Sequence, residues 1–131
     1  MSEGQRFVDK CLNTNIESNP WPHQVLADTL SLDAFNKLRD QCIEKLNFDT
    51  KELVHIFPKQ YKEYGLDFYD ETVDICTNLL HNLKQLCEMF PKHRTFHSLG
   101  VNAHISVTPP LPYKFHIHQE GLEKIWSSVT Y

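Results

Sequence analysis

The sequence predicts an α+β domain in which N-terminal helices pack on an antiparallel sheet. Two observations predict this class. Apolar residues recur at helical spacing in two segments before residue 91, and the spacing changes to strand-like alternation after residue 100. The chain has 131 residues and 40% hydrophobic content, which is enough for one buried core. We therefore expect a single domain over 1–131.

The first 30 residues precede the first predicted helix. Residues 1–20 are polar, and Pro20 and Pro22 disfavour helix and favour an extended start. Between His23 and Asp28, Val25 and Ala27 then alternate with Gln24 and Leu26. This alternation predicts a short strand.

A helix is predicted to follow, from Ser31 to about Leu46. Ser31 is expected to cap its first turn, and Asp33 lies near the positive end of its dipole. One face of the helix should be buried, because apolar residues recur at three-and-four spacing. These residues are Phe35, Leu38, Cys42 and Leu46.

The periodic pattern is broken between Asn47 and Leu66. Residues 53–57 suit a short extended segment, Pro58 should end it, and Gly65 marks a turn. A second helix is predicted from Asp70 to Phe90, closed by Pro91. Its apolar positions are Val73, Cys76, Leu80, Leu83, Cys87 and Phe90.

Strands are predicted after this helix. Residues 101–107 alternate between apolar and polar, as a half-buried strand does. The segment 108–112 contains three prolines and should connect strands. Residues 113–118 alternate again, and 125–131 are rich in strand-forming residues.

Charge and composition exclude some classes of protein. The chain has 13 Lys and Arg against 17 Asp and Glu, a net charge of −4, and no basic run, which argues against binding to nucleic acid. Its first residues carry no apolar stretch, so we expect no signal peptide, and no apolar run reaches the roughly 18 residues that could span a membrane. We expect a soluble, cytoplasmic protein whose four cysteines are reduced and structural.

Two histidines and a carboxylate near the end of the chain suggest a metal site. His116, His118 and Glu120 are two residues apart, so on a continuous strand they share one face. Two imidazoles and one carboxylate form the ligand set of non-haem iron(II) enzymes. The pattern therefore predicts iron or another divalent transition metal.

The segment that contains these residues resembles a known family. Residues 113–131 read YKFHIHQEGLEKIWSSVTY. They resemble the core of the prolyl-hydroxylase-like branch of the iron(II)/2-oxoglutarate oxygenases, which reads Tyr-x-x-His-x-Asp, a polar turn, a basic residue, and a strand with Ser or Thr that ends in Tyr. The segments WPHQV (21–25) and LSLDAFNKL (30–38) also resemble the opening strand and first helix of that branch.

The resemblance implies a fold, cofactors and residue roles. It implies a double-stranded β-helix (jelly-roll), incomplete here because eight core strands are needed. His118 takes the place of the first iron ligand, Glu120 replaces the usual Asp as the second, and Tyr131 stands where relatives contact 2-oxoglutarate. His116 matches no ligand position. The resemblance also implies hydroxylation of a small-molecule or peptidyl substrate that the sequence does not identify.

In that family the third ligand and the base that binds 2-oxoglutarate come from later strands. We therefore expect a chain truncated at its C-terminus, with incomplete sheet edges that favour homo-oligomers. His104 is a further candidate for the third ligand. Two alternatives remain open: a non-catalytic binding or structural module on the same scaffold, and a cupin-like protein that binds metal through His116, His118 and Glu120 together.

Overall fold

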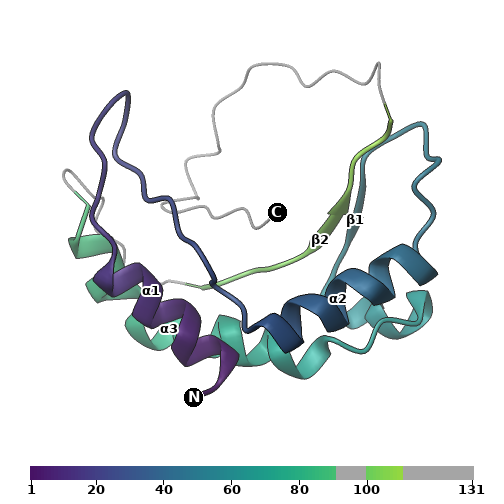
Figure 1. Ribbon diagram of the computed structural model, residues 1–131, viewed down its shortest axis with the longest axis horizontal. Helices are drawn as coiled ribbons and strands as arrows, with labels where there is room; N and C mark the ends of the chain where they lie inside the picture. Colours follow the sequence, from purple (N-terminus) through teal and green to yellow (C-terminus); the bar gives the residue numbers. More distant parts are fainter. Residues whose placement is uncertain (91–99, 111–131) are drawn as a thin grey trace.

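The computed structural model describes residues 1–90 and 100–110 (Figure 1). In this part of the chain four helices account for 51% of the residues, and the sheet has two strands. The predicted α+β jelly-roll class is therefore wrong: the described chain is helix-rich, and no jelly-roll is evident in it. The predicted strands 113–118 and 125–131 lie outside the described residues.

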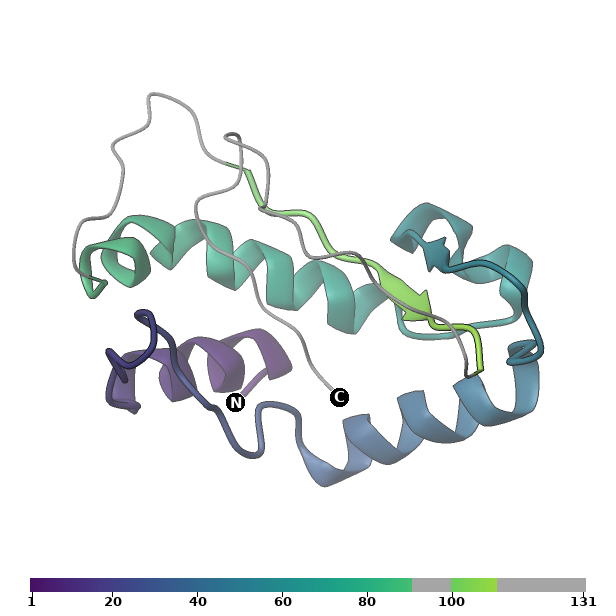
Figure 2. The same ribbon diagram turned by 90° about the horizontal axis from the view of Figure 1, so that it is seen from above.

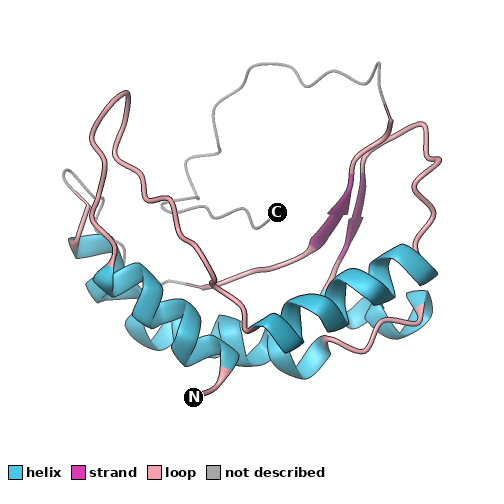
Figure 3. Ribbon diagram, in the orientation of Figure 1, coloured by secondary structure: helices cyan, strands magenta, loops and turns pink. Residues whose placement is uncertain are grey.

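Helices form one layer, and a two-stranded ribbon lies on one side of it (Figure 3). Helices α1 (Glu3–Asn13) and α3 (Tyr69–Glu88) pack side by side, as the view from above shows (Figure 2). Helix α2 (Leu32–Lys45) lies beyond the N-terminal ends of both. No helix in the described ranges is long and apolar enough to cross a membrane.

Helix α1 lies in the polar segment before Pro20, where the sequence predicted no element. Its first turn is closed by a capping box, in which Gln5 N–H donates to Ser2 Oγ (3.2 Å) and Ser2 N–H donates to Gln5 Oε1 (3.1 Å). Phe7, Val8 and Cys11 are buried on the face that joins the core cluster shared with α3. Their spacing of one and three residues places them on one side of a helix, although the segment is polar on average.

The start of α1 approaches α3 unusually closely. Gly4 is buried, and its N–H donates to Asp74 Oδ2 at 2.6 Å. A side chain at this position would collide with the Asp74 carbonyl oxygen and would lie 2.5 Å from Asn78 Nδ2. The absence of a Cβ at Gly4 therefore sets how closely the two helices pack.

Helix α2 confirms its prediction. Ser31 is the N-cap, and its hydroxyl accepts a hydrogen bond from Ala34 N–H at 3.2 Å. The buried face is narrower than predicted, because Leu38 and Cys42 are partly buried while Phe35 is 38% exposed.

No strand forms over residues 23–28, where the described backbone makes only a single bridge between Glu17 and His23.

The broken region after α2 has the predicted extended segment and turn, and also a 3₁₀ helix that was not predicted. Strand β1 (Val54–Ile56) is followed by a 3₁₀ helix, η1 (Pro58–Tyr64), which begins at the predicted breaker. Gly65 ends η1 with a φ of 74°, in the left-handed region where glycine is favoured. The chain then turns into α3.

Helix α3 also confirms its prediction, although two residues of its apolar stripe are exposed to solvent. Leu83 and Cys87 are buried, whereas Val73 and Leu80 are 42% and 45% exposed. The helix ends at Glu88, before the predicted end at Phe90.

Strand β2 (Ile105–Val107) pairs antiparallel with β1, so that Val54 is opposite Val107 and His55 is opposite Ser106. Partly buried or buried residues alternate with exposed ones from 101 to 107, as predicted, although only three residues form the strand. The ribbon packs its apolar face on a core cluster that joins α2, η1 and the start of α3. The buried members of this cluster are Ala34, Leu46, Ile56, Tyr61, Leu66, Phe68 and Val107.

Candidate functional site

The residues predicted to bind iron and 2-oxoglutarate lie outside the described part of the chain. This applies to His118, Glu120 and Tyr131, and also to His116. Within residues 1–90 and 100–110, no group of three or more His, Cys, Asp or Glu side chains could hold a metal ion. His104, the further candidate for the third ligand, is described, and its surroundings are informative.

His104 belongs to a group of side chains on the exposed face of the β1–β2 ribbon. It lies one residue before β2, and its ring meets the ring of His55 edge to face, with centroids 4.4 Å apart and planes at 79°. Phe57 lies on the other side, with its centroid 5.4 Å from that of His104. The structure therefore places two imidazoles in contact on one accessible surface.

Ser106 completes this group. Its hydroxyl is hydrogen-bonded to Nδ1 of His55 at 3.0 Å, across the ribbon. Strand alternation explains the arrangement, because Val54, Ile56, Ile105 and Val107 face the core while the residues between them face outward. Sequence reasoning did not select His55, although its position between two β-branched residues in a predicted strand was a usable signal.

The four cysteines are free thiols in the structure. Burial raises the pKa of the Cys11 thiol to about 11, and burial also raises the pKa of Cys42, Cys76 and Cys87. A thiol with a raised pKa is protonated near neutral pH, and the thiolate is the nucleophile. These side chains are therefore part of the packing and poor candidates for nucleophilic catalysis.

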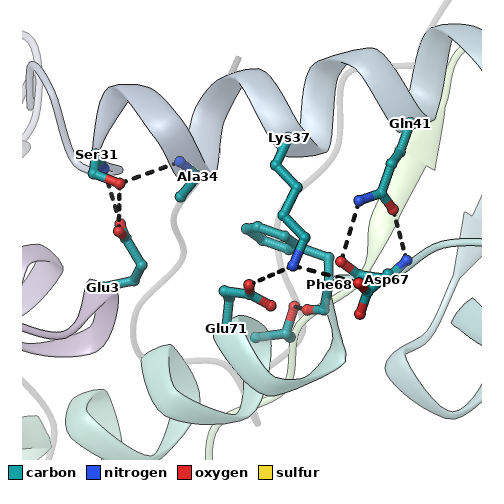
Figure 4. A network of polar contacts seen from close by, with 9 residues as sticks. Glu3, Ser31, Ala34, Lys37, Gln41, Asp67, Phe68 and Glu71 are labelled. Carbon is teal, nitrogen blue, oxygen red and sulfur yellow. Dashed lines mark hydrogen bonds and ion pairs between the residues drawn. The ribbon is translucent and has the colours of Figure 1, made fainter.

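A polar network joins the N-terminal ends of α1 and α2 (Figure 4). The backbone N–H and the hydroxyl of Ser31 donate to the carboxylate of Glu3 at 2.8 and 2.5 Å, while the hydroxyl accepts from Ala34 N–H. Every polar atom in this group has a role in capping or in joining the helices. We assign it a structural role.

A second part of the network joins α2 to the start of α3. Lys37 Nζ donates to Glu71 at 2.7 Å and lies 3.7 Å from Asp67, and these contacts raise the pKa of Lys37, with the Glu71 hydrogen bond as the main cause. The Gln41 amide exchanges two hydrogen bonds with the Asp67 backbone, at 2.6 and 3.2 Å. These contacts join α2 to the start of α3, and we assign them a structural role.

The chain matches no protein-family model, no curated protein and no solved structure. The resemblance to the iron(II)/2-oxoglutarate oxygenases therefore depends on the residues of 113–131 and of the N-terminal segments alone.

Proposed function

We propose that this protein acts as an iron(II)- and 2-oxoglutarate-dependent oxygenase in the cytoplasm, with His118 and Glu120 as two of the three iron ligands. The observation that carries the proposal is the His118-x-Glu120 pair within a 19-residue segment that follows the family pattern through Lys124, Ser127 and Tyr131. The reduced, unpaired cysteines support a cytoplasmic location.

The donor set fits the metal. A neutral imidazole and a carboxylate are ligands that iron(II) accepts, and a two-histidine, one-carboxylate triangle leaves three positions for cosubstrate and oxygen. Glu120 is one methylene longer than the usual aspartate, a length that a carboxylate ligand tolerates because its torsions adjust. When bound, iron and 2-oxoglutarate supply the oxidation of an unactivated C–H bond by O₂, with succinate and carbon dioxide as coproducts.

The protein residues in this proposal bind and orient. His118 coordinates through a neutral ring nitrogen, so metal affinity falls as the ring becomes protonated at low pH. Glu120 supplies negative charge that offsets part of the charge of the metal. Tyr131 would help to hold 2-oxoglutarate through its hydroxyl group. His116 shares their predicted strand face without coordinating.

Metal binding tests the assignment directly. Anaerobic titration of the chain with iron(II), or with cobalt(II) as a substitute that resists oxidation, should give weak binding, because only two of the three ligands are assigned within this sequence. The variants His118→Ala and Glu120→Ala should abolish this binding, whereas His116→Ala should leave it unchanged. His81→Ala, at an exposed position on α3, is the matched histidine control.

The same variants separate the alternatives. Equal behaviour of wild type and His118→Ala would reject the iron site and favour a non-catalytic module. Equal losses in His116→Ala, His118→Ala and Glu120→Ala would favour a cupin-like site. Addition of 2-oxoglutarate to the iron-loaded chain should produce the visible charge-transfer band of its chelate, weakened in Tyr131→Phe. We expect no succinate formation by this chain, because only two of the three ligands are assigned, and robust turnover would show that the chain supplies the third.

A further inference from the structure

Helix α3 carries an apolar strip that is largely open to solvent. The strip consists of Tyr69, Val73, Cys76 and Leu80, at successive spacings of four, three and four residues. Tyr69, Val73 and Leu80 are 51%, 42% and 45% exposed, and Cys76 is partly buried. Apolar side chains that are exposed next to one another, unlike single scattered ones, mark an interaction surface.

This strip lies on the side of α3 that faces away from α1. Gly4 of α1 meets Asp74 and Asn78, which are about 130° and 170° around the helix from the middle of the strip. Figure 2 shows α1 along one side of α3, and no described α-helix runs along the other side. The 3₁₀ helix η1 contacts α3 through Tyr61 and Thr72, on the core side of the strip. One long side of α3 is therefore open to a partner.

The charges beside the strip indicate which partner fits. Alternating spacings of three and four apolar residues form the seam of a coiled coil, so the partner should be another helix. Asp70, Thr77 and Lys84 are exposed and follow one edge of the seam at seven-residue spacing. The ion pairs within residues 1–90 and 100–110 include neither Asp70 nor Lys84.

This edge is complementary to itself. When two copies of a helix pair antiparallel around a two-fold axis, the same edge of each copy meets the other. Asp70 of each copy then faces Lys84 of the other, and the two Thr77 side chains meet near the axis. The acidic start and the basic later turn of α3 therefore favour a second copy of this chain as the partner.

We propose that α3 packs antiparallel on α3 of a second copy and forms a two-fold symmetric homodimer. The register that pairs Asp70 with Lys84 also places Leu80 of each copy on Cys76 of the other. Residues 69–80 span about 17 Å of helix, a short contact, so we expect an affinity of roughly micromolar or weaker. The proposal does not depend on the proposed iron site.

Sedimentation equilibrium of the full chain under reducing conditions, over roughly 5 to 500 µM, tests the proposal. We expect a monomer–dimer equilibrium. Leu80→Glu should weaken dimerisation at least about tenfold, because it places two charges in the apolar seam. Gln85→Glu is the matched control, at an exposed position on the far side of α3, and should leave dimerisation unchanged. A chain that stays monomeric over this range would overturn the proposal, and a lower unfolding temperature of monomeric Leu80→Glu would then show that the strip is covered within the chain.

Charge reversal tests the partner helix and its direction. At low salt, Asp70→Lys and Lys84→Glu should each weaken dimerisation about tenfold, because each places like charges opposite one another at two symmetric positions. The double variant should restore dimerisation to the wild-type level. It shares with Asp70→Lys the same change in the first turn of α3, so any effect on folding is matched.

Two results of the charge reversals would reject this dimer. A dimer that is unaffected by the single reversals would be joined through another surface, such as the edges of the β1–β2 ribbon. A double variant that dimerises no better than Asp70→Lys would show that Asp70 and Lys84 do not face each other. Unfolding temperatures measured at low concentration establish that each variant is folded.

Discussion

The close approach of α1 to α3 makes Gly4→Ala the sharpest test of the packing. In an ordinary helix this change stabilises by up to about 1 kcal/mol. At Gly4 the added methyl group would collide with the Asp74 carbonyl oxygen, which is backbone, so α1 must move away from α3. The sign of the effect therefore depends on tertiary packing and not on helix propensity.

The magnitude follows from two costs. Forcing a methyl group into a packed contact costs about 1–3 kcal/mol. Moving α1 also lengthens the 2.6 Å hydrogen bond from Gly4 N–H to the Asp74 carboxylate, and a bond to a charged group contributes about 1.5–3 kcal/mol. After the propensity gain of about 1 kcal/mol is subtracted, we expect a net loss of about 1.5–5 kcal/mol. For a chain of this size the unfolding midpoint should fall by roughly 5–20 °C.

Urea and thermal unfolding measure this loss. Gly100→Ala is the matched control, because a Cβ at Gly100 meets nothing within 4 Å, and it should change stability by less than about 0.5 kcal/mol. In Asp74→Ala the hydrogen bond is already lost, so adding Gly4→Ala should cost less than it does in the wild type. A Gly4→Ala protein as stable as the wild type would refute the close contact between the helices.

Three other predictions concern caps, thiols and the core. Ser31→Ala should destabilise the protein by about 1–2 kcal/mol in urea unfolding, since it removes the cap of α2 and a partner of Glu3; an unchanged midpoint would show that the cap is not formed. The pKa of Cys11 is raised from 9.0 to about 11, so its thiol contributes stability below pH 9 that is lost as the pH rises to 11. Unfolding free energies across this range should fall more steeply for the wild type than for Cys11→Ala, and parallel curves would contradict the raised pKa. Leu86→Ala should cost about 2–5 kcal/mol, because Leu86 is 1% exposed, and a loss below 1 kcal/mol would mean that this core cluster is loosely packed.

Local signals in the sequence were sufficient for several elements. The Ser31 cap and the three-and-four spacing of the apolar residues after it predicted α2. A longer run of apolar residues at the same spacing, from residue 70, predicted α3. Gly65 occupies the left-handed turn that was expected of it. These predictions succeeded because hydrogen bonds between neighbouring residues determine caps, turns and helical period.

Other local signals were missed or misleading. The Ser2 and Gln5 capping box marked the start of α1, but the polar composition of residues 1–20 hid it. Alternation over 23–28 predicted a strand that does not form, because alternation shows what a strand would bury and does not supply a neighbouring strand. The described chain is consequently richer in helix than the sequence indicated.

The candidate sites also differ in whether the sequence or the tertiary structure indicates them. The iron hypothesis comes from the sequence by itself, because His118 and Glu120 are two residues apart and a strand through them would place both on one face. Only the tertiary structure brought His55 beside His104 and Gly4 against Asp74, in the latter case across 70 residues of chain. Such contacts depend on how β1 pairs with β2 and how α1 packs on α3, and the free energy of that packing comes from residues distributed over the whole core.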